Sequence, residues 1–271
     1  MPELPEVETT RRGIEPHIVG RRISRLIVHE HRLRWPVDLT VPAVIAGSVI
    51  RRAGRRAKYL LLETEAGTLI LHLGMSGSLR VLPAATPRIA HDHLDIELDS
   101  GQTLRFNDPR RFGSLLFTTD DPALHPLLKS LAPEPLDDGF DGAYLWKITR
   151  RRSVAIKQLL MNSRLVVGVG NIYASEALFR ARIRPRRQSR SLKMAECVRL
   201  ARAIKATLAL AVKVGGTTLR DYVGADGNPG YFRQKLYVYE RDGRPCRVCG
   251  KPVKQFTQGQ RSTYWCAHCQ K

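Results

Sequence analysis

The chain has 271 residues, with 45 lysines and arginines against 25 aspartates and glutamates, and a formal net charge of +20. Its hydrophobic fraction of 43% is ordinary for a globular protein and excludes a disordered, collagen-like or coiled-coil chain. There is no run of about eighteen apolar residues, and the first residues lack the basic and apolar regions of a signal peptide. We therefore expect a cytosolic protein. The positive charge favours a polyanionic partner, either nucleic acid or an anionic membrane surface.

The basic residues are concentrated in particular segments. Residues 147–190 hold twelve basic side chains and one acidic side chain, whereas residues 91–146 hold four basic and eleven acidic ones. A solvated surface explains a short basic run but fits poorly with so large an excess. A membrane partner would require a basic amphipathic helix with a broad apolar face or a lipidation motif, and the sequence has neither. The predicted partner is nucleic acid.

The N-terminal part is predicted to form one short helix and then β-strands. Residues 5–13 have an early proline, acidic first turns and Gly13 as a candidate cap, and Glu8 and Arg12 have the spacing of an ion pair. Beyond this helix the hydrophobic period is two, with strands expected at residues 59–64, 68–72, 93–99 and 102–106. Short antiparallel strands of this kind predict a β-sandwich or barrel. The acidic side chains of 93–99 occupy the polar phase of their strand and are expected to face solvent.

After a connector rich in proline, aspartate and glycine at residues 119–142, the period becomes helical. Helices are predicted at 154–161, capped by Ser153, at 171–180, and at 192–213, where Cys197 lies on an apolar stripe as a core thiol. A short helix from Thr218 and a glycine-rich loop at 224–230 are expected to follow.

Four of the five cysteines form two Cys-x-x-Cys pairs, at Cys246, Cys249, Cys266 and Cys269. Two such turns can complete a tetrahedral four-thiolate zinc site, whereas a pair of disulfides is disfavoured in a cytosolic chain. With all four positions taken by sulfur, the predicted Zn²⁺ is structural. His268 could compete as a ligand but is not needed.

Two basic or polar positions suit phosphate binding. Between the cysteine pairs, a β-hairpin could present Arg261 to a DNA phosphate, although an ordinary exposed arginine explains the position equally well. Gly168-Val-Gly-Asn171 opens a helix without the third glycine of a dinucleotide site. Free N–H groups there could bind one phosphate, and an ordinary capped helix is the alternative.

Pro2 follows the initiator methionine and precedes Glu3. Removal of Met1 would expose a secondary amine, which could attack a sugar C1′ and form an iminium. Many proteins begin with Met-Pro by chance, so composition alone does not support this chemistry.

Six motifs occur together in one order: the Pro2 start, Arg-Arg-Ala-Lys58-Tyr, His-Leu-Gly-Met75-Ser-Gly, Asp-Pro-Arg110-Arg-Phe-Gly, Gly-Val-Gly-Asn171-Ile-Tyr-Ala-Ser-Glu and the four-cysteine module. In this combination the sequence closely resembles the bacterial formamidopyrimidine-DNA glycosylases over residues 2–271. The related endonuclease VIII enzymes usually begin Pro-Glu-Gly-Pro and lack the methionine, arginine and phenylalanine set.

The resemblance implies a role for each matching residue. Pro2 would attack C1′ of a flipped nucleoside, and Glu3 would protonate the sugar ring oxygen. Lys58 and Arg261 would hold phosphates and assist β- and δ-elimination. The implied DNA contacts are His91, Arg110, Arg151, Lys157 and Asn171, with Arg151 replacing the lysine common in relatives. Met75, Arg110 and Phe112 would fill the space left by the flipped base and read the opposite cytosine; without the resemblance, core packing would be the simpler role for Met75 and Phe112.

We therefore predict an α+β protein with an N-terminal β-sandwich with one helix (1–132), a helical helix-two-turn-helix domain (133–230) and a C-terminal four-cysteine zinc-finger hairpin (231–271). The predicted activity is excision of oxidised purines from duplex DNA, followed by strand cleavage at the abasic site. The alternatives are an endonuclease VIII-like enzyme for oxidised pyrimidines and a non-catalytic zinc-finger DNA-binding protein. We expect a bacterial, cytoplasmic, nucleoid-associated monomer with one Zn²⁺ and no membrane partner.

Overall fold

The computed structural model describes residues 2–216 and 236–271. These residues form two compact units, one of residues 2–129 with 214–216 and the other of residues 130–213 with 236–271. The helix predicted from Thr218 and the loop predicted at 224–230 lie outside the described residues. The domain boundaries after residues 132 and 230 stay predictions.

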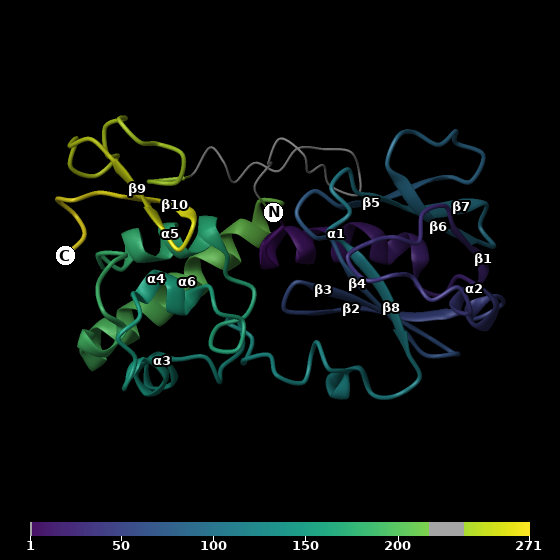
Figure 1. Ribbon diagram of the computed structural model, residues 1–271, viewed down its shortest axis with the longest axis horizontal. Coiled ribbons are helices and arrows are strands. Elements are labelled where there is room, and N and C mark those ends of the chain that lie inside the picture. Colours follow the sequence, from purple (N-terminus) through teal and green to yellow (C-terminus); the bar gives the residue numbers. More distant parts are fainter. Residues whose placement is uncertain (1, 217–235) are drawn as a thin grey trace. The chain divides into compact units, whose positions relative to one another are not determined.

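The first unit contains two four-stranded antiparallel sheets (Figure 1). One sheet has the order β1-β6-β7-β5, made of β1 (Ile23–Val28), β6 (Asp92–Leu98), β7 (Gln102–Asn107) and β5 (Ser78–Pro83). The other has the order β2-β3-β4-β8, made of β2 (Ile50–Arg56), β3 (Tyr59–Thr64), β4 (Thr68–His72) and β8 (Ser114–Thr118). The strands predicted at 59–64, 68–72, 93–99 and 102–106 are confirmed to within one residue, and they pair as β3 with β4 and β6 with β7.

Both sheets contribute to one apolar core, as expected for a sandwich. Leu26, Ile96 and Phe106 come from one sheet and Leu62 and Leu71 from the other, and all are buried. Alternating apolar residues produce this arrangement because successive side chains of a strand point to opposite faces. The short helix α2 (Val41–Ile45) adds to the same core, and the 3₁₀ helix η1 (Pro122–Leu124) follows the last strand.

Helix α1 (Leu4–Ile18) is longer than predicted and continues through Gly13. Ile14 and Ile18 are fully buried in the sandwich core, so burial beyond the glycine extends the helix. The predicted ion pair is present, with 2.7 Å between Arg12 Nε and Glu8 Oε1. Helix α1 contacts β2, β3 and β5.

The second unit is helical, with α3 (Gly142–Thr149), α4 (Ile156–Leu160), α5 (Asn171–Arg180), the 3₁₀ helix η2 (Ser189–Ser191) and α6 (Met194–Lys213). Helix α5 has its predicted bounds, and the predicted stripe of α6, including Cys197, is buried. Ser153 does not cap α4: Ala155 forms an isolated β-bridge with Gln188, which delays the start of the helix.

The C-terminal residues form the predicted hairpin, with β9 (Lys254–Gln258) paired to β10 (Arg261–Trp265). Its two turn residues, Gly259 and Gln260, both have positive φ angles, of 54° and 59°. Such a two-residue turn matches the twist of antiparallel strands. Among the described residues, no helix combines the length and apolar character that crossing a membrane requires.

Candidate functional site

Two connections pass from one sheet of the sandwich to the other, and they lie side by side. Residues 73–77 join β4 to β5, and residues 108–113 join β7 to β8. Because His72 pairs with Ser114 and Ser78 pairs with Asn107, the two connections begin and end beside one another. We call them the paired crossovers.

The paired crossovers carry three residues of the predicted site. Met75 is partly buried in the first crossover, while Arg110 and Phe112 are exposed in the second. The Arg110 guanidinium carbon lies 5.1 Å from the centre of the Phe112 ring. Gly74, with φ of 64°, approaches the second crossover so closely that a Cβ would lie 2.4 Å from the Phe112 carbonyl carbon. Only glycine permits this approach.

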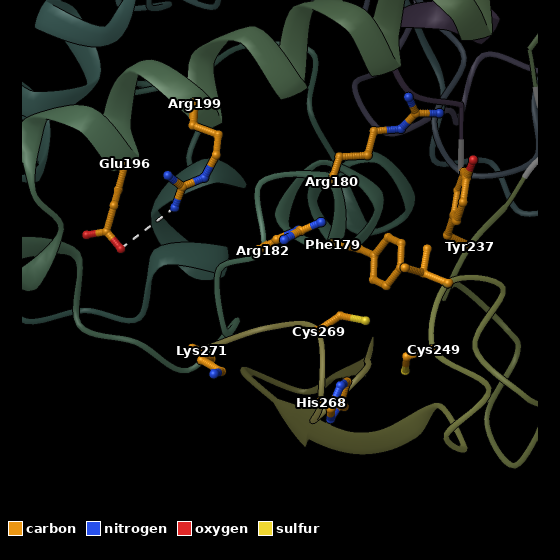
Figure 2. A pocket seen from close by; sticks show the side chains of 11 residues that line it. Phe179, Arg180, Arg182, Glu196, Arg199, Tyr237, Cys249, His268, Cys269 and Lys271 are labelled. Carbon is orange, nitrogen blue, oxygen red and sulfur yellow. Dashed lines mark ion pairs between the residues drawn. The ribbon is translucent and has the colours of Figure 1, made fainter.

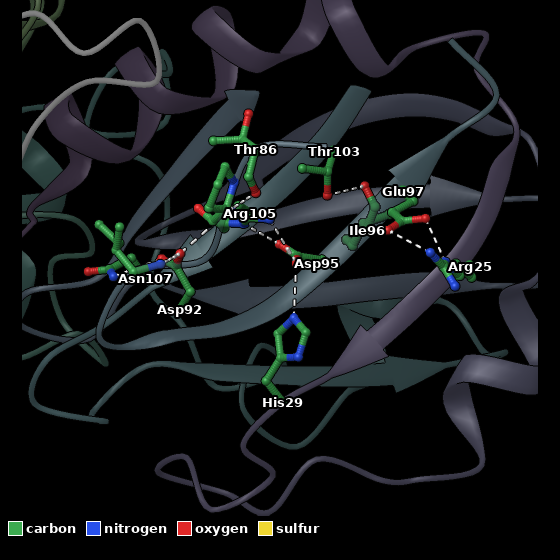
Figure 3. Close-up of polar contacts among 12 residues, drawn as sticks. Arg25, His29, Thr86, Asp92, Asp95, Ile96, Glu97, Thr103, Arg105 and Asn107 are labelled. Atoms are coloured by element: carbon green, nitrogen blue, oxygen red, sulfur yellow. Dashed lines mark hydrogen bonds and ion pairs between the residues drawn. The ribbon is translucent and has the colours of Figure 1, made fainter. Parts of the chain in front are cut away.

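His91 lies on a third loop, which precedes β6, and its side chain is exposed. Arg105 of β7 fixes this loop by donating from Nη1 to the carbonyl oxygens of Thr86 (3.0 Å) and Pro87 (3.1 Å). The same guanidinium forms a two-point ion pair with Asp95, which also contacts His29 at 2.9 Å (Figure 3).

The expectation that the acidic residues of this strand face solvent is wrong for Asp95, which is only 3% exposed. The side chains of the strand alternate between its two faces as predicted, but Arg105, rather than water, covers Asp95 on the polar face. Arg105 and His29 together hold the pKa of Asp95 below its usual value against the opposing effect of burial.

Pro2 and Glu3 lie at the start of α1, and both are buried. Glu3 and Glu6 form a capping box: the Glu3 carboxylate accepts from the Glu6 N–H, and Glu6 Oε2 accepts from the Glu3 N–H at 2.9 Å. This reciprocal pair holds Glu3, the predicted general acid, at the start of the helix, directly after the predicted nucleophile Pro2.

Lys58 lies in the two-residue turn between β2 and β3, directly after Ala57, whose φ of 54° is unusual for a side-chain-bearing residue. Its neighbour Tyr59 packs against His72, with 4.8 Å between the ring centres. Burial, together with the positive charges of Lys58 and Arg34, lowers the pKa of His72 to about 4. The imidazole is therefore neutral at pH 7, which suits its Nδ1 as acceptor for the Gly74 N–H at 2.9 Å.

In the second unit, Lys157, Asn171 and the zinc hairpin meet. Lys157 is 2% exposed, and its ammonium donates to Asn171 Oδ1 (2.6 Å), Thr263 Oγ1 (2.7 Å) and the Ser262 carbonyl (3.2 Å). Asn171 Nδ2 also donates to the Ser262 carbonyl, at 3.0 Å. Arg261 is exposed on the same hairpin, directly after its turn.

Arg151 is exposed just beyond α3, with a positive φ of 59°. The predicted site residues thus lie in several separate groups. Lys157 is not at the surface, because its ammonium is buried among oxygen acceptors of the protein. The catalytic and DNA-contacting roles of all these residues stay predictions.

The four cysteines of the predicted metal site come together, with all sulfur atoms within 4.8 Å of one another. The Sγ separations are 4.0 Å for Cys246 and Cys269 and 3.5 Å for Cys249 and Cys266. A tetrahedron with Zn–S bonds of about 2.3 Å has edges of about 3.8 Å, so Zn²⁺ fits this group. A disulfide would require sulfur atoms about 2.0 Å apart.

A cavity of about 710 Å³ lies beside two of these cysteines (Figure 2). Its lining includes four basic side chains, Arg180, Arg182, Arg199 and Lys271, and one carboxylate, Glu196. A zinc ion held by these four thiolates would carry net negative charge, which the four basic side chains would offset. Glu196 is itself paired with Arg187 at 2.5 Å.

Glu176 is a structural residue that the sequence patterns did not single out. It is fully buried on α5, and its carboxylate accepts from the backbone N–H groups of Tyr237, Val238 and Tyr239 at 2.9–3.0 Å. Burial raises the pKa of Glu176 despite these donors. The sequence offered one signal for this residue, since Glu176 ends the motif that begins at Gly168. Its hydrogen-bond partners could not be predicted, because they lie about sixty residues away in the sequence.

Three family models match the chain in order. They are the formamidopyrimidine-DNA glycosylase N-terminal domain at residues 1–115, the formamidopyrimidine-DNA glycosylase H2TH domain at 131–223 and a zinc finger found in FPG and IleRS at 243–271. Proteins named formamidopyrimidine-DNA glycosylase from Stutzerimonas stutzeri and Stenotrophomonas maltophilia are 55% and 57% identical to the chain. Each match covers 100% of both sequences.

Solved structures agree with this assignment. The chain is similar to MutM (Fpg) of Thermus thermophilus, with 41% identity, a TM-score of 0.89 and coverage of 99% of this chain and 98% of that chain. It is also similar to Lactococcus lactis Fpg in a complex with abasic-site DNA, with 33% identity, a TM-score of 0.92 and 99% coverage of both chains. From three family models that match in order and relatives that match over their full length, the chain belongs to the formamidopyrimidine-DNA glycosylase family.

Proposed function

We propose that this protein removes oxidised purines, such as 8-oxoguanine and formamidopyrimidines, from duplex DNA and then cleaves the strand. The observation that carries the proposal is the convergence of Met75, Arg110 and Phe112 on the paired crossovers. An enzyme that acts on a base must first take it out of the stack, which costs a few kcal/mol. Exposed apolar and cationic side chains on one rigid surface suit the space that the base leaves.

The relatives support the same substrate. A Lactococcus lactis Fpg mutant in complex with DNA containing Fapy-dG has 33% identity and a TM-score of 0.94 over the whole of both chains. The exposed Arg261 and Arg151 supply cations for the phosphates of such DNA, and the exposed His91 supplies a polar side chain.

The chemistry we propose begins at Pro2 after removal of Met1. The Pro2 nitrogen forms a bond to C1′ as the glycosidic bond breaks and the damaged base leaves with a proton. Glu3 protonates the sugar ring oxygen, so that the ring opens and an iminium forms between Pro2 and the sugar. Loss of a C2′ proton then breaks the C3′–O bond, the δ-step breaks the C5′–O bond, and water releases the remaining sugar fragment from Pro2.

The test is trapping of the iminium with borohydride on duplex DNA that contains 8-oxoguanine opposite cytosine. The wild-type protein should form a covalent adduct, and Pro2→Gly should lose most of it. A wild type without an adduct would refute the mechanism and favour a non-catalytic DNA-binding protein. A Pro2→Gly variant that traps fully would refute Pro2 as the nucleophile. Intact-protein mass spectrometry shows whether Met1 is removed.

A comparison of lesions separates this proposal from the endonuclease VIII-like alternative. Excision of 8-oxoguanine should be faster than excision of thymine glycol in otherwise identical duplexes, and the reverse order would favour the alternative. We further propose that the protein acts in the bacterial cytoplasm, as a monomer associated with the nucleoid through its DNA binding.

A further inference from the structure

We propose that Asp108 is the positioning residue that holds Met75, Arg110 and Phe112 together as one wedge, and that its loss impairs base extrusion while sparing the lyase chemistry. This inference rests on the proposed function. It concerns a residue that is fully buried and acts through the paired crossovers.

Asp108 is fully buried and begins the second crossover. Its Oδ1 accepts from Ser76 Oγ at 2.7 Å, so the carboxylate reaches the first crossover at the residue beside Met75. Its Oδ2 accepts from the Gly113 N–H at 2.8 Å, directly after Phe112. Oδ1 also accepts from the Arg110 N–H at 3.3 Å. One carboxylate therefore binds next to each of the three wedge residues.

The backbone of Asp108 extends the same network to the third loop. Its N–H donates to the His91 carbonyl at 3.0 Å. Its carbonyl oxygen lies 2.9 Å from His93 Nε2 and accepts from the Arg111 N–H at 3.2 Å. The loops that present Met75, His91, Arg110 and Phe112 thus share a single buried centre.

A shared centre matters because the wedge side chains themselves are exposed or only partly buried. Phe112 is 43% exposed, so core packing does not fix its position. Insertion into a base stack requires each tip to be placed within a fraction of an ångström, and such precision comes from buried hydrogen bonds behind the site. Asparagine in place of Asp108 keeps the volume, but its amide NH₂ cannot accept a hydrogen bond. The Arg110 and Gly113 N–H groups are bound by different carboxylate oxygens, so at least one of these two contacts is lost.

The experiment compares two substrates for Asp108→Asn and the wild type. One is 8-oxoguanine opposite cytosine in duplex DNA, which must be extruded. The other is a preformed abasic site in single-stranded DNA, which has no base to extrude. We expect kcat/KM for the duplex to fall at least tenfold, while cleavage of the single strand stays within twofold. Equal losses on both substrates, or no loss on the duplex, would overturn the inference.

Asp38→Asn is the control, because the Asp38 carboxylate likewise accepts from backbone N–H and hydroxyl donors, here the two of Thr40, but in an exposed turn. It should leave both rates unchanged. If Asp108→Asn does not fold, Ser76→Ala tests the single link to the Met75 turn. Ser76→Ala should lower kcat/KM for the duplex several-fold and leave cleavage of the single-stranded abasic site unchanged. Equal effects on both substrates would reject a positioning role for Asp108. A wild type that cleaves neither substrate would instead refute the proposed function.

Discussion

Lys157 and Asn171 are bound directly to each other, with 2.6 Å between Lys157 Nζ and Asn171 Oδ1. The same ammonium holds Thr263 and the Ser262 carbonyl of the zinc hairpin. Lys157 therefore ties the start of α5 to the hairpin that carries Arg261. A buried ammonium is tolerated because oxygen acceptors surround it.

Replacing Lys157 by methionine should destabilise the protein, because it removes the ammonium that donates to all three oxygens and leaves Asn171 Oδ1 without this donor. We expect the free energy of unfolding to fall by about 1–3 kcal/mol, measured by denaturant titration. Lys147→Met, at an exposed position of α3, should change it by less than about 0.5 kcal/mol. The opposite outcome would be that Lys157→Met keeps full stability but makes DNA binding less sensitive to salt. If the slope of the log DNA-association constant against log salt became shallower by about 0.9, Lys157 would contact one phosphate directly.

The neutral state of His72 predicts a loss of stability in acid. Its folded pKa is about 4, below the unfolded value, so the unfolded chain binds a proton first as pH falls. This contribution is fully present above about pH 6.5 and is lost as the pH falls toward 4.

The matched variant is His72→Asn, which keeps an acceptor for the Gly74 N–H but cannot titrate in this range. Between pH 7 and 4, the wild type should lose up to about 3 kcal/mol more unfolding free energy than this variant. If the unfolding free energies of the two proteins instead changed in parallel with pH, the pKa of His72 would not be lowered in the folded state.

Metal removal should unfold the C-terminal module, because zinc binding energy of about 10–16 kcal/mol is folding energy for so small a unit. The isolated protein should contain one zinc ion per chain. Cys266→Ser should lose most of this zinc and the tight binding of lesion DNA, whereas Cys197→Ala should keep both, since Cys197 lies in the helical core. Metal analysis and DNA titration check this, and full zinc content in Cys266→Ser would contradict a four-cysteine site.

Substitution of two arginines on the same sheet, Arg105 and Arg25, should lower the stability of the protein by very different amounts (Figure 3). Arg105→Gln leaves Asp95 buried without its ion-pair partner and should cost about 3–5 kcal/mol of stability. Arg25→Gln breaks the exposed pair with Glu97 and should cost less than about 1 kcal/mol.

Hydrogen exchange adds a local test of the Arg105 contacts. Exchange of the backbone amides at residues 88–91 should quicken in Arg105→Gln, because the carbonyl oxygens of Thr86 and Pro87 lose their donor and the loop is no longer held. Equal stabilities of the two variants, with equal exchange in this loop, would argue against a positioning role for Arg105.

By itself, the sequence determined the elements whose signals are local. The spacing of Cys246, Cys249, Cys266 and Cys269 determined the zinc site, because each pair needs only a tight turn. Hydrophobic periodicity predicted α5, α6 and the hairpins of the sandwich, since each of these depends on neighbours within a few residues. The family motifs predicted which residues form the site, although not where each of them lies.

The tertiary structure decided which polar residues are buried and what holds them. Asp95 stands at a polar position in the alternating pattern of its strand, yet it is buried because Arg105 covers it. Lys157 belongs to a basic segment, yet it binds oxygens of Thr263, 106 positions away. The contacts of Asp108 with Ser76 depend on two sheet connections that run side by side, and such long-range pairings arise only when the sheets assemble, because no local pattern encodes them.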